Sequence, residues 1–319
     1  MTPPDTCGAM EFPLADVAES SASSTHAGRW SVLAADVSRL ARPRIALMVL
    51  ATVVTAMWLT AGRPADMPGL VWLLVGTALV AASSSIANQI LERDTDRLMP
   101  RTADRPIAAG RLGVAMAWLL AAFTLVLGVG MVVASAGWQP AAAAVATWLL
   151  YVLVYTPLKR RTPLNTAVGA VAGALPVAIG WLAADGPASL QAGQGAAALA
   201  VAALATVLYL WQFPHFMAIA WLYRRQYAAA GLRMLTVDDP SGLRAGGQSL
   251  AAALAMVPVS LVLAVPSGSI RLFLAAAVAA IIYCVATVRF AVRRDDASAR
   301  GLLLTSLGCL LGLLTAAVV

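Results

Sequence analysis

The stretch from Asn88 to Pro106 concentrates the residues of this chain that could carry out chemistry. Four of the fifteen Asp and Glu residues fall in it, interleaved with four arginines. Asn88, Glu92 and Asp96 recur at intervals of four, so a helix would place their oxygen atoms along one face. Such oxygens suit a hard cation such as Mg²⁺, which shares its coordination with water and phosphate. We therefore predict Asn88, Glu92 and Asp96 as metal ligands and catalytic residues.

Arginines continue the same spacing up to and beyond Pro100. Arg97, Arg101 and Arg105 each carry a planar guanidinium whose donors match phosphate oxygens. The stretch thus predicts metal ligands beside phosphate contacts, as a diphosphate site requires. The alternative is a solvated, salt-bridged loop without chemistry. We favour the diphosphate site because Asn88 and its neighbours end an apolar run, where a solvated loop has no need of them.

Two other segments carry candidate residues. Tyr155 to Arg161 contains Lys159, the only lysine of the chain, which suggests a point charge on a phosphate. The alternative is a basic cluster that only sets membrane orientation. His215, which follows Trp211, is the only histidine in a predicted membrane span. Such a histidine is either functional or bonded to a neighbouring helix, and the sequence leaves both open.

Composition defines the elements that must position these residues. The chain is 61% hydrophobic and 12% charged, which indicates an integral membrane protein. We predict an all-α polytopic membrane protein with nine transmembrane helices, each of about 20 residues. A kink or an end is expected at Pro214. The predicted spans are residues 45–62, 70–91, 113–134, 139–157, 164–183, 195–222, 247–266, 270–289 and 301–319.

The positive charges predict how the spans are oriented. With nine spans, Arg63 and Arg271 are the only basic residues opposite the N-terminal side, and basic loops stay preferentially in the cytoplasm. We expect the N-terminus and the candidate loops to be cytoplasmic. The net charge of +7 then reflects topology, and no nucleic-acid partner is expected. We predict that residues 1–28 form a disordered cytoplasmic tail and that residues 29–319 form a membrane domain.

Together these motifs resemble the protohaem IX farnesyltransferases, or haem O synthases, a branch of the intramembrane UbiA-type prenyltransferases. The resemblance covers most of residues 38–240. It is carried by Asn88, Glu92 and Asp96 with Arg101-Thr102 and Arg105-Pro106 after them, by Arg42-Pro43-Arg44, by Tyr155 to Arg160, and by Trp211 with Pro214-His215-Phe216.

The resemblance implies a nine-helix bundle whose central cavity lies under cytoplasmic loops, in a bacterial plasma (inner) membrane. There Mg²⁺ and basic residues would hold farnesyl diphosphate, and the farnesyl group would pass to a vinyl group of haem B. The product, haem O, serves haem A and cytochrome oxidase biogenesis, so a haem A synthase is a candidate partner besides the lipid bilayer. Implied diphosphate contacts are Arg42, Arg97, Arg101, Arg105, Tyr155, Lys159 and Arg160, and implied haem contacts are His215, Trp211 and Tyr227.

One position departs from the resemblance. An acidic residue is usual before the tyrosine that follows the sixth span, and here Gln226 precedes Tyr227. Glutamine offers a cation only a neutral carbonyl oxygen. Either the second metal position is weaker, or Asp238, with Asp239 beside it, substitutes as a metal ligand. The departure keeps a quinone or chlorophyll-type acceptor open, and a polytopic transporter or membrane scaffold is the alternative of another class. A transporter would place its charges nearer the middle of the membrane.

Overall fold

A computed structural model describes residues 34–62 and 67–318. The chain divides into two units, Met1–Arg39 and Leu40–Val319. Of the first unit, residues 34–39 are described, and they are helical. The predicted tail, residues 1–28, lies outside the described residues. The second unit contains the candidate membrane spans and the candidate site.

Within the described part of the chain, nine helices are long and apolar enough to cross a membrane. The all-α class with nine spans is therefore confirmed, and the ends agree with prediction to within a few residues. The spans are α2 (Pro43–Ala61), α3 (Met67–Leu91), α5 (Val114–Ala136), α6 (Trp138–Leu149) continued by η1 (Leu150–Tyr155) and α7 (Thr156–Leu158), α8 (Asn165–Ala174) with α9 (Pro176–Ala183), α11 (Gly195–Leu222), α14 (Leu243–Ala264), α15 (Ile270–Arg293) and α16 (Asp296–Val318).

Two spans begin several residues before the apolar runs that predicted them. The Asp239 carboxylate accepts a hydrogen bond from the Arg244 backbone N–H at 2.8 Å, at the start of α14. The Asp295 carboxylate accepts one from the Ser298 N–H at 2.7 Å, at the start of α16. Each carboxylate satisfies a donor that the first helical turn leaves unpaired and also suits the positive end of the helix. Polar residues outside the apolar run thereby join the helix.

Helix irregularities occur before Pro176 in the fifth span and in the fourth span. The helix α11 continues through Pro214, whereas the fifth span divides between α8 and α9 just before Pro176. In the fourth span, η1 is a π-helical turn, and the Thr156 hydroxyl donates to the Tyr151 carbonyl at 2.9 Å. A π-turn adds a residue to the helix and so changes the direction of the side chains that follow it.

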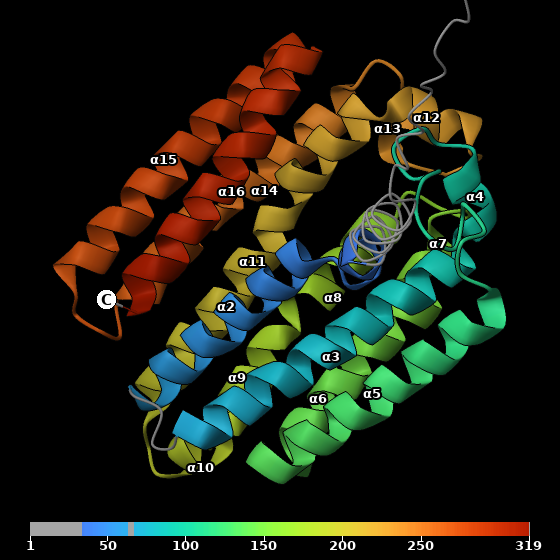
Figure 1. Ribbon diagram of the computed structural model, residues 1–319. Coiled ribbons are helices and arrows are strands. Elements are labelled where there is room, and N and C mark those ends of the chain that lie inside the picture. Colours follow the sequence, from blue (N-terminus) through green and yellow to red (C-terminus); the bar gives the residue numbers. More distant parts are fainter. Residues whose placement is uncertain (1–33, 63–66, 319) are drawn as a thin grey trace, which may run out of the picture. The chain divides into compact units, whose positions relative to one another are not determined.

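The bundle is held by close helix contacts (Figure 1). α3 packs along α5, α11 along α14, and α15 along both α14 and α16. A Cβ added to Gly76 of α3 would lie 2.8 Å from the carbonyl oxygen of Gly128 on α5. Glycine at these positions lets the two backbones approach, as is common where membrane helices pack.

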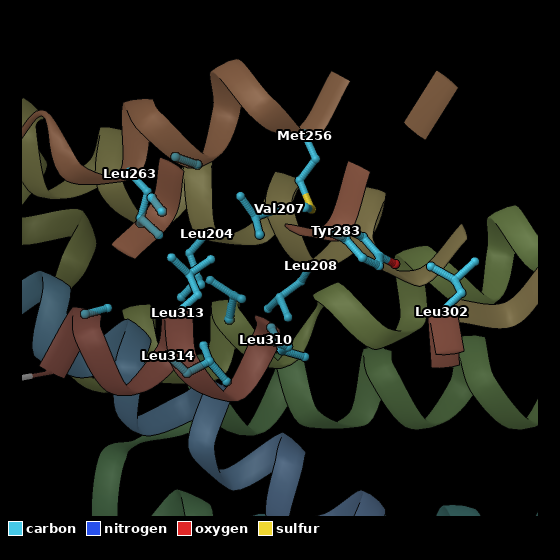
Figure 2. Close-up of a cluster of buried hydrophobic side chains, with 14 of the residues drawn as sticks. Leu204, Val207, Leu208, Met256, Leu263, Tyr283, Leu302, Leu310, Leu313 and Leu314 are labelled. Atoms are coloured by element: carbon cyan, nitrogen blue, oxygen red, sulfur yellow. The ribbon is translucent and has the colours of Figure 1, made fainter. Parts of the chain in front are cut away.

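The largest buried cluster joins α11 to the C-terminal helices (Figure 2). Leu204 and Leu208 of α11 meet Met256 and Leu263 of α14 and Leu310 of α16. Lipid tails are as apolar as leucine, so such a cluster stabilises a membrane bundle mainly through close packing. It fixes α11, whose end carries one of the candidate loops.

Short helices gather at one end of the bundle. α4 (Arg93–Arg97), α7, α12 (Arg224–Ala229) and α13 (Leu235–Asp238) lie there, and α10 (Gly186–Gln191) lies at the other end (Figure 1). Met99 packs against Tyr227, Leu232 and Met234, and the Arg233 N–H donates to the Lys159 carbonyl at 2.7 Å. The charged segments that follow α3, α7 and α11 thus meet.

Candidate active site

The end of α3 continues helically into α4, as the spacing of Asn88, Glu92 and Asp96 predicts. The Glu92 N–H donates to the Asn88 carbonyl at 2.9 Å, and the Asp96 N–H donates to the Glu92 carbonyl at 2.7 Å. Glu92 itself is a turn residue between the two helices. All three residues are buried. Two carboxylates and an amide are therefore stacked where the bundle meets its loops.

Glu92 forms a buried ion pair with Lys159. The Lys159 Nζ lies 2.7 Å from Glu92 Oε1, and each side chain is 12% exposed. Arg105 Nη1 lies 4.0 Å from the other oxygen, Oε2. Burial acts to raise the pKa of Glu92, but the Lys159 ammonium, with Arg42 and Arg105, holds that pKa below its usual value. Burial acts to lower the pKa of Lys159, and Glu92 nevertheless raises it above its usual value. Both groups are therefore charged at neutral pH.

Asp96 is paired on one oxygen and free on the other. Its Oδ2 accepts from Arg105 Nη1 at 2.6 Å, and its side chain is 1% exposed. Its Oδ1 is buried without a hydrogen-bond partner. Burial raises the pKa of Asp96, and the Arg105 guanidinium offsets this only in part. A buried carboxylate oxygen without a donor is costly, so this oxygen is suited to bind a cation.

Asn88 is held by side chains from two other elements. Its Oδ1 accepts from Arg42 Nη2 at 3.2 Å, and its Nδ2 donates to the Thr156 hydroxyl at 3.1 Å. Arg42 has a left-handed backbone with φ of 49° at the start of α2, directly before Pro43. This conformation is uncommon for a residue other than glycine and costs about 1 kcal/mol or more. The strained turn directs the Arg42 guanidinium to Asn88.

Aromatic rings accompany the cations. The Lys159 ammonium lies 4.5 Å from the centre of the Tyr155 ring, and a Cβ on Gly169 would lie 2.7 Å from that ring. The Arg101 guanidinium lies 4.3 Å from the centre of the Tyr223 ring and donates to the Tyr227 hydroxyl at 3.2 Å. These contacts orient the two cations without neutralising them.

A cavity of about 250 Å³ adjoins the ion pairs. It is lined by Glu92, Thr156, Arg160 and other residues of the same end of the bundle, namely Leu91, Pro157, Arg161 and Leu232. The predicted phosphate contact Arg160 thus lies beside the carboxylate of Glu92. The cavity combines an apolar wall with two guanidinium groups.

Other predicted residues lie apart from this network. Arg97 donates to the Ala108 carbonyl at 2.9 Å and is half exposed. Asp238 is paired with Arg233 at 3.2 Å. Among the described residues, no hydrogen bond or ion pair joins Arg97 or Asp238 to the carboxylates of Glu92 and Asp96. The assignments of Arg97 and Asp238 remain predictions.

Trp211 and His215 meet α16 inside the bundle. Their rings stack with centres 4.5 Å apart, and Trp211 Nε1 donates to the Ser306 carbonyl at 2.8 Å. His215 Nδ1 lies 2.8 Å from the Ser306 hydroxyl, which donates its proton to the Leu303 carbonyl at 2.6 Å. A hydroxyl has one proton, so His215 Nδ1 is the donor and Nε2 carries the free lone pair.

The residues present fit a divalent cation. Asp96 Oδ1 is a buried oxygen without a donor, and the Glu92 carboxylate is its neighbour in the stack. In the described ranges, no three His, Cys, Asp or Glu side chains gather to form a complete protein cage. Mg²⁺ does not require one, because it is usually held by one or two carboxylates with water and substrate phosphates. Gln226 Oε1 is also buried without a partner.

Three residues of the network were not predicted. Thr156 bonds Asn88, Tyr223 stacks on Arg101, and the Thr102 hydroxyl donates to the Asp96 carbonyl at 3.0 Å. The motifs contain Thr102 and Thr156, but their hydroxyls carry no charge that would single them out. Tyr223 directly follows the sixth span, which contains many aromatic residues, and only the fold distinguishes it.

The nine-helix bundle, with stacked Asn, Glu and Asp side chains facing basic residues at one end, is the architecture of an intramembrane prenyltransferase. The profile of the UbiA prenyltransferase family matches residues 49–312, and the chain belongs to this family. It is therefore a multi-pass membrane enzyme that transfers prenyl groups.

Two named relatives within this family are similar to the chain over most of its length. A protoheme IX farnesyltransferase of Rhodopirellula baltica is 45% identical over 225 residues, which cover 70% of this chain and 76% of the relative. The enzyme of the same name from Solibacter usitatus is 37% identical over 290 residues, which cover 85% of this chain and 93% of the relative. The chain thus aligns with these enzymes over most of their length.

Solved structures share the fold at low sequence identity. A digeranylgeranylglyceryl phosphate synthase superposes with a TM-score of 0.71 and 14% identity, covering 89% of this chain and 96% of its own. A UbiA homologue of Archaeoglobus fulgidus bound to GPP and Mg²⁺ gives a TM-score of 0.62 at 16% identity. The superposition covers 89% of this chain and 100% of the homologue. At such identities the likeness concerns the fold.

Proposed function

We propose that the chain transfers the farnesyl group of farnesyl diphosphate to a vinyl group of protohaem IX, giving haem O and diphosphate. The observation that carries this proposal is the 45% identity to a protoheme IX farnesyltransferase over 70% of the chain. The buried cluster of Glu92, Asp96, Lys159 and Arg105 beside a cavity supports it, because a diphosphate and its metal need both signs of charge.

The basic residues act on the leaving group. Arg42 donates to Asn88, Lys159 pairs with Glu92, and Arg160 borders the cavity. Together with Arg101 and Arg105 they would bind diphosphate oxygens. Their positive charges stabilise the negative charge that grows on the diphosphate as the allylic C–O bond breaks. The family's structural relative binds GPP with Mg²⁺, and Asn88, Glu92 and Asp96 would hold this ion, which adds charge neutralisation at the same oxygens.

Bond formation requires an apolar, dry environment for the farnesyl cation. The C–O electron pair leaves with the diphosphate, and the vinyl π electrons of the acceptor form the new C–C bond. Water then adds to the carbon left positive and loses a proton, which gives a hydroxyethylfarnesyl side chain. The apolar helices below the charged end exclude water from the first of these steps.

Membrane orientation follows from the positive charges. The loops after α3, α7 and α11 carry ten of the 21 arginines and meet at one end of the bundle, and basic loops remain preferentially cytoplasmic. We assign this end to the cytoplasm of a bacterial inner membrane, where farnesyl diphosphate would enter. Consumption of the product by a docked haem A synthase remains a prediction.

For the acceptor, we assign His215 to the iron of haem. Ser306 fixes the Nδ1–H tautomer and leaves Nε2 unprotonated, and this is the form in which imidazole binds a metal. His215→Ala is expected to weaken haem B binding by about tenfold or more, and Ser306→Ala to weaken it less, as loss of a residue that orients a ligand does. Absorption spectra of the ferric complex should lose the histidine signature in His215→Ala.

Metal-free protoporphyrin IX provides the control for this assignment. A ligand to iron contributes nothing to the binding of the metal-free macrocycle, so its affinity should be the same in the wild type and in His215→Ala. If His215→Ala lost affinity equally for haem B and for protoporphyrin IX, the role of His215 would be to pack α11 against α16.

Product analysis tests the function as a whole. Purified protein incubated with haem B, farnesyl diphosphate and Mg²⁺ is expected to yield haem O by mass spectrometry of the extracted haems, and a parallel sample with EDTA should yield none. Folded protein that makes no haem O would contradict the proposal. Transfer to phenolic or naphthoate acceptors would then identify a quinone-type enzyme, and the absence of all transfer would favour a transporter or scaffold.

A further inference from the structure

Cationic side chains already donate to three of the oxygens that are proposed to bind a metal, namely Glu92 Oε1, Asp96 Oδ2 and Asn88 Oδ1. Glu92 Oε1 is 2.7 Å from Lys159 and Oε2 is 4.0 Å from Arg105. Asn88 Oδ1 accepts from Arg42, and Asp96 Oδ2 accepts from Arg105. Asp96 Oδ1 alone of these oxygens is buried without a partner. A divalent cation would therefore find Asp96 Oδ1 without a hydrogen bond and Glu92 Oε2 with its nearest cation 4.0 Å away, while Lys159 holds Glu92 Oε1.

The charge balance also opposes a metal ion on its own. Arg42, Lys159 and Arg105 bring three positive charges to the two carboxylates of Glu92 and Asp96. The cluster is therefore positive before any metal arrives. An added divalent cation would increase this charge at a site where little water screens it. A diphosphate with about three negative charges would make the sum about −2, and a divalent cation that arrives with it would bring the sum close to neutral.

Lys159 is the cation best suited to move. Arg105 bridges both carboxylates, whereas Lys159 contacts Glu92 Oε1 from the end of a flexible four-carbon stem. The cavity of about 250 Å³ lies beside Glu92 and is bordered by Thr156 and Arg160. This gives the ammonium a place where it can meet a diphosphate close to its present position.

We propose that Lys159 reserves the Glu92 carboxylate, so that the site takes up a divalent cation only together with a diphosphate. The arriving diphosphate attracts the Lys159 ammonium and releases Glu92 Oε1 for the cation. The inference rests on the proposed function for the identity of the site and adds the order in which its ligands bind. Free Mg²⁺ therefore does not occupy the site between turnovers.

Binding of Mn²⁺, measured by equilibrium dialysis and electron paramagnetic resonance, tests this order. The wild-type protein is expected to bind Mn²⁺ weakly alone and at least about tenfold more tightly with inorganic diphosphate. Lys159→Gln should bind Mn²⁺ without diphosphate at least about tenfold more tightly than the wild type does. Removing a unit charge a few ångströms from the ion changes its binding by more than the ~1.4 kcal/mol that corresponds to tenfold.

Arg93→Gln is the matched control. It removes one positive charge from the same end of the bundle, but Arg93 contacts the exposed Asp94 at 3.1 Å, so Mn²⁺ binding should follow the wild type. Wild-type protein that binds Mn²⁺ equally with and without diphosphate would overturn the proposal, whether or not Lys159→Gln folds. Since no haem is present, failure of haem O synthesis would leave this result unaffected, and the two proposals fail separately.

Discussion

Turnover is expected to fall on the order of 10³-fold or more in Glu92→Gln and in Asp96→Asn. Each change replaces a buried carboxylate that faces Arg105 with a neutral amide. A metal ion and the groups that fix it stabilise the leaving charge by several kcal/mol, and each 1.36 kcal/mol is about tenfold in rate. Steady-state assays of haem O formation, with Mg²⁺ varied, measure the effect.

Asp94→Asn is the control for these carboxylates. Asp94 belongs to the same charged stretch, but its side chain is 70% exposed and pairs with Arg93 and Arg97. Exposed pairs of this kind contribute about 0–1 kcal/mol, so its loss should leave turnover near that of the wild type. Full activity in Glu92→Gln or in Asp96→Asn would exclude that residue from the metal site.

Stability must be separated from chemistry at Glu92. Glu92→Gln leaves the buried Lys159 ammonium without its partner, which costs about 3–5 kcal/mol when a buried pair is broken. Glu92→Gln/Lys159→Gln removes both charges and should regain much of this loss in thermal unfolding. Because the double variant still lacks the carboxylate, it should remain inactive.

The second large effect is expected for Arg105→Gln. Arg105 Nη1 is 2.6 Å from Asp96 and 4.0 Å from Glu92, and the side chain is 19% exposed. Its loss removes a phosphate donor and leaves two neighbouring carboxylates facing each other with less compensation. We expect turnover to fall about 10²- to 10³-fold, as when one preorganised donor is lost, and the unfolding temperature to fall as well.

Arg97→Gln separates the role of this guanidinium from its spacing in sequence. Arg97 has the same place in the repeat of four, but it bonds the Ala108 carbonyl and is half exposed. A smaller loss of turnover than in Arg105→Gln is expected there, and Arg105→Lys should recover part of the activity because it keeps the charge but not the fork. Equal losses in Arg97→Gln and Arg105→Gln would mean that net charge alone matters.

The sequence predicted the spans well because their signal is local. A run of about 20 apolar residues is long enough to cross a bilayer in any context, and nine such runs became nine spanning helices in the described residues. The starts of α14 at Leu243 and of α16 at Asp296 differed from the prediction. Each start depends on a single carboxylate that accepts a hydrogen bond from a backbone N–H. Hydropathy does not register such bonds.

The candidate site was predictable in its parts but not in its pairing. The repeat of Asn88, Glu92 and Asp96 is visible in one continuous stretch of sequence. The pair of Glu92 and Lys159, by contrast, joins residues 67 positions apart. Spacing also could not tell Arg105, which reaches both carboxylates, from Arg97, which does not. For His215, the sequence left two readings open, and the Ser306 hydrogen bond now specifies which nitrogen is available.

The π-helical turn η1 has a consequence for how the lysine is aimed. One residue in excess of the regular α-helical repeat rotates everything after it by about 100° around the helix axis. Lys159 follows Leu150–Tyr155 directly through the short α7. The direction in which Lys159 leaves the helix therefore depends on the number of residues in the fourth span, in addition to the Tyr155 ring that its ammonium contacts. Insertions and deletions in this segment would alter the site as strongly as a substitution within it.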